Sequence, residues 1–142
     1  MFNPSRNQIR LFFIEAWKKY TSKQMLSDLE NIALTWMLEH PEFLKYYDEQ
    51  FIDKDFAVES GQTNPFLHLS MHLAIEEQIR SNQPPGIQQA FETLSSKFNS
   101  NHEAAHALFD CLAEQIYQNQ TYQTEFSSTA YLLCIQEKIK KS

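Results

Sequence analysis

Hydrophobic residues recur every three or four positions along nearly the whole chain, and they do not alternate with polar residues over the length of a strand. That spacing is typical of amphipathic α-helices packed against a core. The pattern predicts an all-α fold: a helical bundle of about five main helices, with short connecting helices and no sheet. Only 2 glycines occur in 142 residues, which also favours long helices over a turn-rich β protein. We expect a single helical domain over residues 1–142.

Capping residues mark where the helices begin. Asn3-Pro4 and Asn64-Pro65 each place a capping amide before a proline at the first helical position. Ser27 and Ser100 each open a capping box, with a glutamate three residues later. Pro41 disfavours helix at the residue before it and ends the second helix there. These signals predict helices over residues 4 to about 20, 28 to about 40, 41 to about 47, 65 to about 81, 87 to 98, 101 to about 118, and 128 to about 140.

Between residues 48 and 63 the helical pattern lapses into the acidic stretch DEQFIDKDFAVESGQT. Long segments without regular structure are uncommon in compact domains, and many are lids or partner contacts. The segment is therefore a candidate contact for a protein partner. The alternative is an ordered crossover, held down by the apolar side chains of Phe51, Ile52 and Phe56.

Charge and cysteine usage narrow the class of protein. The net charge of −6 argues against nucleic acid or an anionic membrane as a partner, because both require a basic face. No run approaches the ~20 apolar residues of a membrane span, and the N-terminus lacks the apolar core of a signal peptide. Cys111 and Cys134 form no CxxC motif, so we expect two reduced core thiols in a cytoplasmic protein.

Four of the five histidines form two HxxxH pairs, each followed one turn later by a carboxylate. The two sets are His68, His72 and Glu76, and His102, His106 and Asp110. An HxxxH pair places two imidazoles on one helix face, within reach of one metal ion. Both pairs lie within apolar arcs of their helices, where unpartnered polar groups would be costly. Because helical bundles build metal sites from facing helices, we predict that the two helices are neighbours and share a buried centre.

A mixed histidine and carboxylate set suits iron, zinc or manganese. The alternative is a buried polar histidine network without metal, in a non-catalytic binding or interaction module that could form a homodimer. No motif for an organic cofactor, a phosphate loop or a nucleophile is evident, so no reaction can be assigned and enzyme activity stays open. His40, at a helix end beside Pro41, is expected to be a dipole partner rather than a ligand. Glu15 and Glu30 could be drawn inward, but a solvated edge position and simple capping are their simpler roles.

Several segments together resemble a known family. MFNPSR at the start, LEHPEF at residues 38–43, GQTNPFLHLSMHLAIEEQ at 61–78 and QPPGI at 83–87 are similar to the bacterial family called domain of unknown function 1841. The resemblance spans most of the chain. It implies a small bacterial cytoplasmic protein without an assigned activity, and it assigns no role to any residue.

Overall fold

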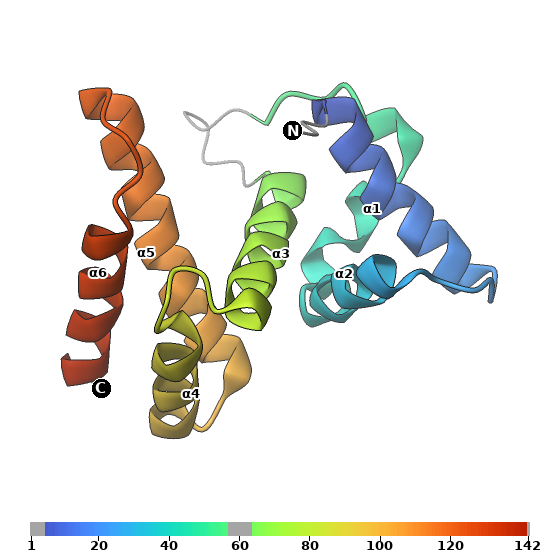
Figure 1. Ribbon diagram of the computed structural model, residues 1–142. Helices are drawn as coiled ribbons and strands as arrows, with labels where there is room; N and C mark the ends of the chain where they lie inside the picture. The colour runs from blue at the N-terminus through green and yellow to red at the C-terminus, as the bar shows by residue number, and fades with distance from the viewer. Residues whose placement is uncertain (1–4, 57–63, 142) are drawn as a thin grey trace. The chain divides into compact units, whose positions relative to one another are not determined.

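The computed structural model describes residues 5–56 and 64–141, and every regular element within these ranges is a helix (Figure 1). The all-α prediction is confirmed, with six α-helices in the described ranges where about five main helices were expected. The elements are α1 (Arg6–Thr21), α2 (Asp28–Glu39), the 3-10 helices η1 (Pro41–Tyr46) and η2 (Glu49–Phe51), α3 (Pro65–Ser81), α4 (Ile87–Phe98), α5 (Asn101–Tyr122) and α6 (Ser128–Lys141).

The chain divides into two compact units, and the division falls within α3, after Leu73. Unit 1 contains α1, α2, the two 3-10 helices and the first half of α3. Unit 2 contains the second half of α3 together with α4, α5 and α6. The single domain expected over the whole chain stays a prediction.

Three of the predicted helix starts are confirmed by their hydrogen bonds. Ser27 Oγ accepts from the Glu30 N–H at 3.2 Å, while the Glu30 carboxylate accepts from the Ser27 N–H at 2.8 Å. Asn64 Oδ1 accepts from two backbone N–H groups of the first turn of α3, each at 3.1 Å. Ser100 Oγ accepts from the N–H of Glu103 at 3.1 Å. Local side-chain caps therefore decide where these helices begin.

The first helix begins later than expected. Ser5 is the N-cap of α1, and its side chain and backbone exchange hydrogen bonds with Gln8 at 3.2 and 2.8 Å. This capping box serves the same purpose as the predicted Asn3-Pro4 start. Asn3 and Pro4 themselves lie outside the described residues.

In unit 1, α1 packs against α2 (Figure 1). Residues of both helices are fully or almost fully buried: Phe13, Ile14, Ala16, Ala33 and Met37. Lys19 of α1 donates to the buried Glu30 carboxylate of α2 at 2.9 and 3.1 Å, so the capping residue of α2 also joins the two helices.

Arg10 holds the segment that follows η1 against α1. Its Nη1 donates to the backbone carbonyls of Phe51, Ile52 and Lys54 at 3.0, 2.8 and 2.7 Å. The guanidinium also lies 5.5 Å from the ring centroid of Phe56. The backbone of residues 51–54 is therefore anchored to α1 by polar contacts, whereas the ordered-crossover interpretation expected apolar side chains to hold this stretch. A contact with a protein partner through residues 48–63 stays a prediction. Residues 57–63 of the same prediction lie outside the described residues.

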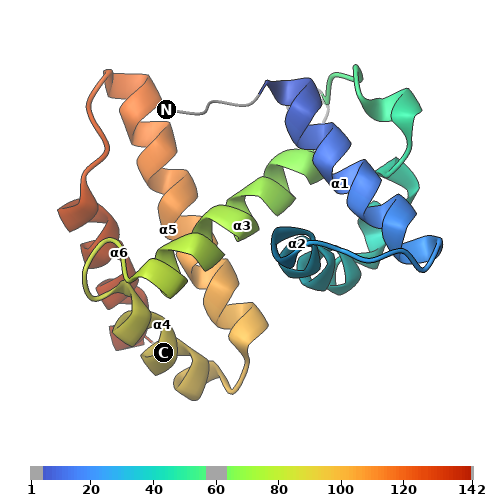
Figure 2. The ribbon, with the colours of Figure 1, turned by 45° about the vertical axis from the view of Figure 1, so that its right-hand side comes forward.

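In unit 2, α4, α5 and α6 pack against one another, and Figure 2 shows α4 and α6 near each other beside α5. The buried side chains are almost all apolar and include Ile87, Leu94, Leu108, Tyr131 and Ile135. The hydroxyl of Tyr131 donates to Gln78 Oε1 at 2.7 Å, which ties α6 to the end of α3 that belongs to this unit.

The expectation of two reduced cysteines is wrong. Cys111 of α5 and Cys134 of α6 form a disulfide between these neighbouring helices. Their Cα atoms lie 5.8 Å apart, within the range that a disulfide spans. A spacing of 23 residues gives no sign of such closeness in the sequence, because helix packing creates it.

Among the described residues, no helix has both the length and the apolar character that crossing a bilayer requires.

Candidate functional site

Three histidines of unit 1 bring their Nε2 atoms together. His72 Nε2 lies 3.3 Å from His40 Nε2 and 3.1 Å from His68 Nε2. One ring nitrogen from each of the three falls within 4.8 Å of those of the other two. A compact set of three imidazole nitrogens therefore exists within unit 1 alone.

Local sequence positions each of the three rings. His68 and His72 stand one turn apart on α3, so the helix itself aligns them on one face. His40 lies between α2 and η1 with φ −124° and ψ 67°, which is not a helical conformation. The following Pro41 disfavours helix at His40, and the chain turns there toward η1.

Aromatic side chains surround the cluster. The Trp36 ring stacks on His72 with centroids 4.1 Å apart and an angle of 5° between the planes. The Phe43 ring lies 5.2 Å from His40 and 5.4 Å from His68. His72 is 0% exposed and His40 is 6% exposed. This packing limits the rotation of the rings and keeps their nitrogens in place.

A carboxylate orients His40 from behind. Glu42 Oε2 lies 2.9 Å from His40 Nδ1. When Nδ1 donates its proton to Glu42, a neutral His40 carries its lone pair on Nε2, the nitrogen that faces His72. Burial is the largest single influence and would raise the pKa of Glu42, but the hydrogen bond from His40, a backbone hydrogen bond and the nearby His40 and His68 together lower the pKa below its ordinary value. Glu42 is thus held as the carboxylate, the form that accepts this proton.

The second predicted set lies in unit 2. The rings of His102 and His106 are in edge contact, with centroids 4.3 Å apart. The Asp110 side chain is 69% exposed and lies 3.7 Å from Lys138 Nζ. In α3, Glu76 lies 3.5 Å from Arg80 Nε. Both predicted carboxylate ligands therefore already take part in ion pairs with basic side chains, and a metal-binding role for them stays a prediction.

His40 is a member of the site that the sequence pattern did not predict, because its position at a helix end suggested a dipole partner. A signal was present in the HPE run at residues 40–42. Pro41 keeps the histidine out of the helix, and Glu42 places a carboxylate within reach of its ring. The inward carboxylate of Glu30 is explained by capping and by Lys19. Glu15 lies near Lys18 at a half-exposed position.

Comparison with known proteins gives the chain a family but no activity. No curated protein and no solved structure matches the sequence. The family model described as "Domain of unknown function (DUF1841)" matches residues 5–137, nearly the whole of the 142-residue chain. The protein therefore belongs to this domain-of-unknown-function family.

Proposed function

We propose that this protein binds a divalent transition metal through His40, His68 and His72. The observation that carries the proposal is the convergence of three imidazoles in a buried aromatic setting, with His40 Nε2 and His68 Nε2 at 3.3 and 3.1 Å from His72 Nε2. Zinc bound by imidazoles at 2.0–2.1 Å in a tetrahedron would hold its ligand nitrogens about 3.3–3.4 Å apart. The observed separations approach this value.

Hydrogen bonding alone accounts less well for the cluster. An imidazole nitrogen either donates one proton or offers one lone pair in the ring plane. His72 Nε2 faces both His40 Nε2 and His68 Nε2, so it can form one ordinary hydrogen bond but not two. A bound cation would instead accept the lone pairs of all three rings. The Glu42 contact to His40 Nδ1 supports this arrangement, because metal-binding histidines usually donate their other N–H to a carboxylate or a carbonyl.

The ligand set narrows the choice among iron, zinc and manganese, the three metals suggested by the sequence. The three ligands of unit 1 are all imidazoles, which suit zinc and iron better than manganese, a metal that prefers oxygen donors. Zinc fits best because it accepts tetrahedral nitrogen coordination.

Three protein ligands leave one position of a tetrahedron to be filled. The sequence-based hypothesis that α5 adds an imidazole, from His102 or His106, is the second part of this proposal. A fourth protein ligand would make the centre structural, whereas water in that position would allow Lewis-acid or hydrolytic chemistry. Glu76 and Asp110 are the weaker ligand candidates, because each would have to leave a basic partner.

Metal content of the untagged protein tests the first part. We expect one zinc or iron per chain by elemental analysis, and tight zinc binding by the chelator-treated protein in competition with a chromogenic chelator. His40→Gln and His72→Gln should each weaken zinc binding by at least about 100-fold. Thermal melting with and without zinc shows whether each variant still folds. A folded protein that takes up neither zinc, iron nor manganese would contradict the proposal.

His102→Gln and His106→Gln test whether α5 supplies a ligand. They also serve as matched controls for the substitutions of His40 and His72. If α5 supplies a ligand, one of the two substitutions will weaken zinc binding as strongly as His72→Gln. If both variants keep the stoichiometry and affinity of the unchanged protein, the site consists of the three unit 1 histidines and a solvent ligand. Cobalt substitution then reports the coordination number through its visible spectrum.

The alternative function is a non-catalytic binding module in which the histidines form a polar network. The tight packing of Trp36 and Phe43 on these rings favours it if no metal binds. The module could form a homodimer or bind a protein through residues 48–63. Light scattering measures the oligomeric state directly. The predicted cytoplasmic location belongs to this proposal as well.

A further inference from the structure

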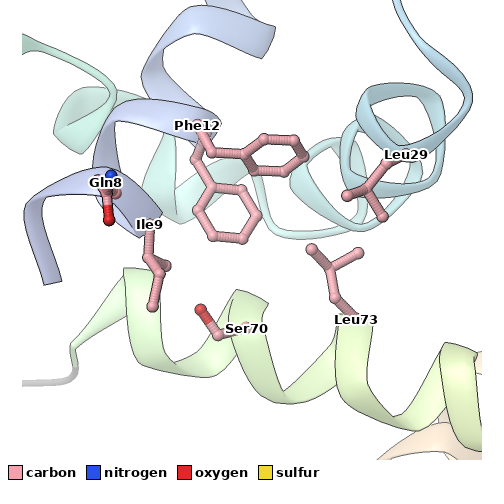
Figure 3. Close-up of a pocket in the computed structure, with 7 residues that line it drawn as sticks. Gln8, Ile9, Phe12, Leu29, Ser70 and Leu73 are labelled. Atoms are coloured by element: carbon pink, nitrogen blue, oxygen red, sulfur yellow. The ribbon is translucent and has the colours of Figure 1, made fainter. Parts of the chain in front are cut away.

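A cavity of 420 Å³ lies in unit 1 between α1, α2 and the first half of α3. Figure 3 shows Ile9 and Phe12 of α1 directed toward Ser70 and Leu73 of α3, with Leu29 of α2 at one side. Phe13 and Gln8 complete the lining. The volume is in the range of about 300–1,000 Å³ that is typical of small-molecule sites. None of the described residues that line this cavity is charged, so it suits an apolar group.

A second cavity of 220 Å³ shares two lining residues, Ile9 and Ser70, with the first. Its other lining residues differ in character, because two of them are Arg6 and Arg10. The remaining three are Asn64, Phe66 and Leu67. An apolar cavity thus adjoins a cationic one across a common wall.

Arg10 is the residue that suggests a ligand in the second cavity, because one of its donors lacks an acceptor among the described residues. It is 2% exposed, and its Nη1 already donates to three backbone carbonyls. Its Nε is also buried, and among the described residues no hydrogen-bond acceptor reaches it. A buried donor without an acceptor is costly, so an anion that accepts from Nε would be favourable there.

Among the described residues, the direct contacts of Arg10 are with neutral groups, although two carboxylates lie near it. Burial, and next the nearby charge of Arg6, lower the pKa of Arg10, while Asp55 and Asp53 act in the opposite direction. Asp55 pairs directly with Arg6 at 2.8 Å. The guanidinium of Arg10 itself is bound by neutral carbonyls and lies over the ring of Phe66 at 5.2 Å. An anion would provide the charge partner that these contacts do not.

We propose that the paired cavities of unit 1 bind a small amphipathic carboxylate, such as a medium-chain fatty acid. Its apolar chain would occupy the larger cavity, and its carboxylate would lie in the smaller one and accept from Arg10 Nε. Ser70 and Leu73 project from α3 about 160° and 100° away from His72, given about 100° per residue. The carboxylate site is therefore separate from the histidine cluster and does not depend on metal binding.

Calorimetric titration of the full-length protein with decanoate, and in parallel with decanol, tests the proposal. The two probes share the apolar chain and differ in the charge of the head group. We expect decanoate to bind at one site per chain with at least about tenfold higher affinity than decanol, because a charge-assisted hydrogen bond to a buried donor contributes that much. Absence of decanoate binding, or equal affinity for the two probes, would overturn the proposal.

A matched pair of variants on α2 tests the location. Leu29 lines the larger cavity and is 53% exposed, so Leu29→Trp can block the cavity without burying a new group in the core. Leu38 is 46% exposed on the same helix and lines neither cavity, which makes Leu38→Trp the control. We expect Leu29→Trp to weaken decanoate binding by tenfold or more, and Leu38→Trp to leave it unchanged. Equal binding by the two variants would place the ligand elsewhere and refute the site.

Discussion

The interior of each unit is stabilised by a different kind of interaction. Among the described residues, the buried polar side chains of unit 1 are Arg10, Glu30, His40 and His72, whereas unit 2 buries Gln115. Unit 2 instead joins its helices through apolar packing and the Cys111–Cys134 disulfide. A polar interior is costly unless its groups are matched, so unit 1 depends on specific partners where unit 2 depends on shape and area.

The two HxxxH pairs show the same contrast at a smaller scale. Both pairs stand one turn apart on a helix, at His68 and His72 and at His102 and His106. In unit 1 the fold places a third imidazole, His40, beside the pair, and the Glu42 carboxylate orients it. Unit 2 has two of the five histidines and cannot form a cluster of three by itself. The spacing supplies two ligands, and a third ligand depends on the fold.

The largest loss of stability is expected when the buried cation of unit 1, Arg10, is replaced. Arg10→Met removes three hydrogen bonds and leaves the carbonyls of Phe51, Ile52 and Lys54 without their donor. We expect the free energy of unfolding to fall by about 3–4 kcal/mol, as measured by urea denaturation. The exposed Arg80→Met should change it by about 0.5 kcal/mol or less. A loss at Arg10 as small as the loss at Arg80 would show that polar anchoring is not what holds unit 1.

Reduction of the disulfide should affect unit 2 almost as strongly. The bond closes a loop between residues 23 apart, and loss of such a constraint costs about 3 kcal/mol. We expect a reductant to lower the melting temperature, and the double variant with Cys111→Ala and Cys134→Ala to be insensitive to it. Two free thiols in protein unfolded without reductant would contradict the bond.

A pH-dependent contribution is expected at Glu30. The backbone N–H of Ser27, and next the hydrogen bond from Lys19, lower the pKa of Glu30 below its ordinary value of 4.5, against the effect of burial. Because the pKa is lower in the folded state, the stabilisation is complete above the ordinary value and is lost as the pH falls through the folded-state pKa. Glu30→Gln should therefore cost about 1–2 kcal/mol at neutral pH and progressively less in acid.

Denaturant unfolding of Glu30→Gln at a series of pH values checks this prediction. Glu92→Gln, an exposed change on α4 of unit 2, is the control and should run parallel to the unchanged protein. A constant cost of Glu30→Gln at every pH would mean that the carboxylate charge does not stabilise unit 1.

The smallest changes in the free energy of unfolding are expected from glycine substitutions after helix ends, and they should be equal in the two units. Lys23 follows the end of α1 with φ 59°, and Gln123 follows the end of α5 with φ 52°, both left-handed conformations that favour glycine. Lys23→Gly and Gln123→Gly should each stabilise the protein by about 0.5–1 kcal/mol in thermal unfolding. Asn99→Gly, at φ 53°, should gain less, because asparagine tolerates this conformation. A destabilised glycine variant would show that the replaced side chain makes contacts worth more than the strain.

The helices and their starts could be predicted from the sequence because their causes are local. The capping bonds of Ser27 and Ser100 join residues three apart. The alignment of His68 with His72 follows from four residues of one helix. These interactions form whenever the segment is helical, and the hydrophobic period shows that it is. The sequence by itself thus determined the all-α class, the positions of the helices and two of the three clustered imidazoles.

The tertiary structure alone decided the rest. His40 meets His72 across 32 residues, and Arg10 reaches carbonyls 41 to 44 residues away. The cysteines pair across 23 residues, against the expectation of free thiols. Such contacts depend on how helix faces pack, and packing results from the shapes of many side chains together rather than from any short pattern. For that reason His40, at a helix end, is the third member of a buried cluster although no periodic pattern in the sequence predicts it.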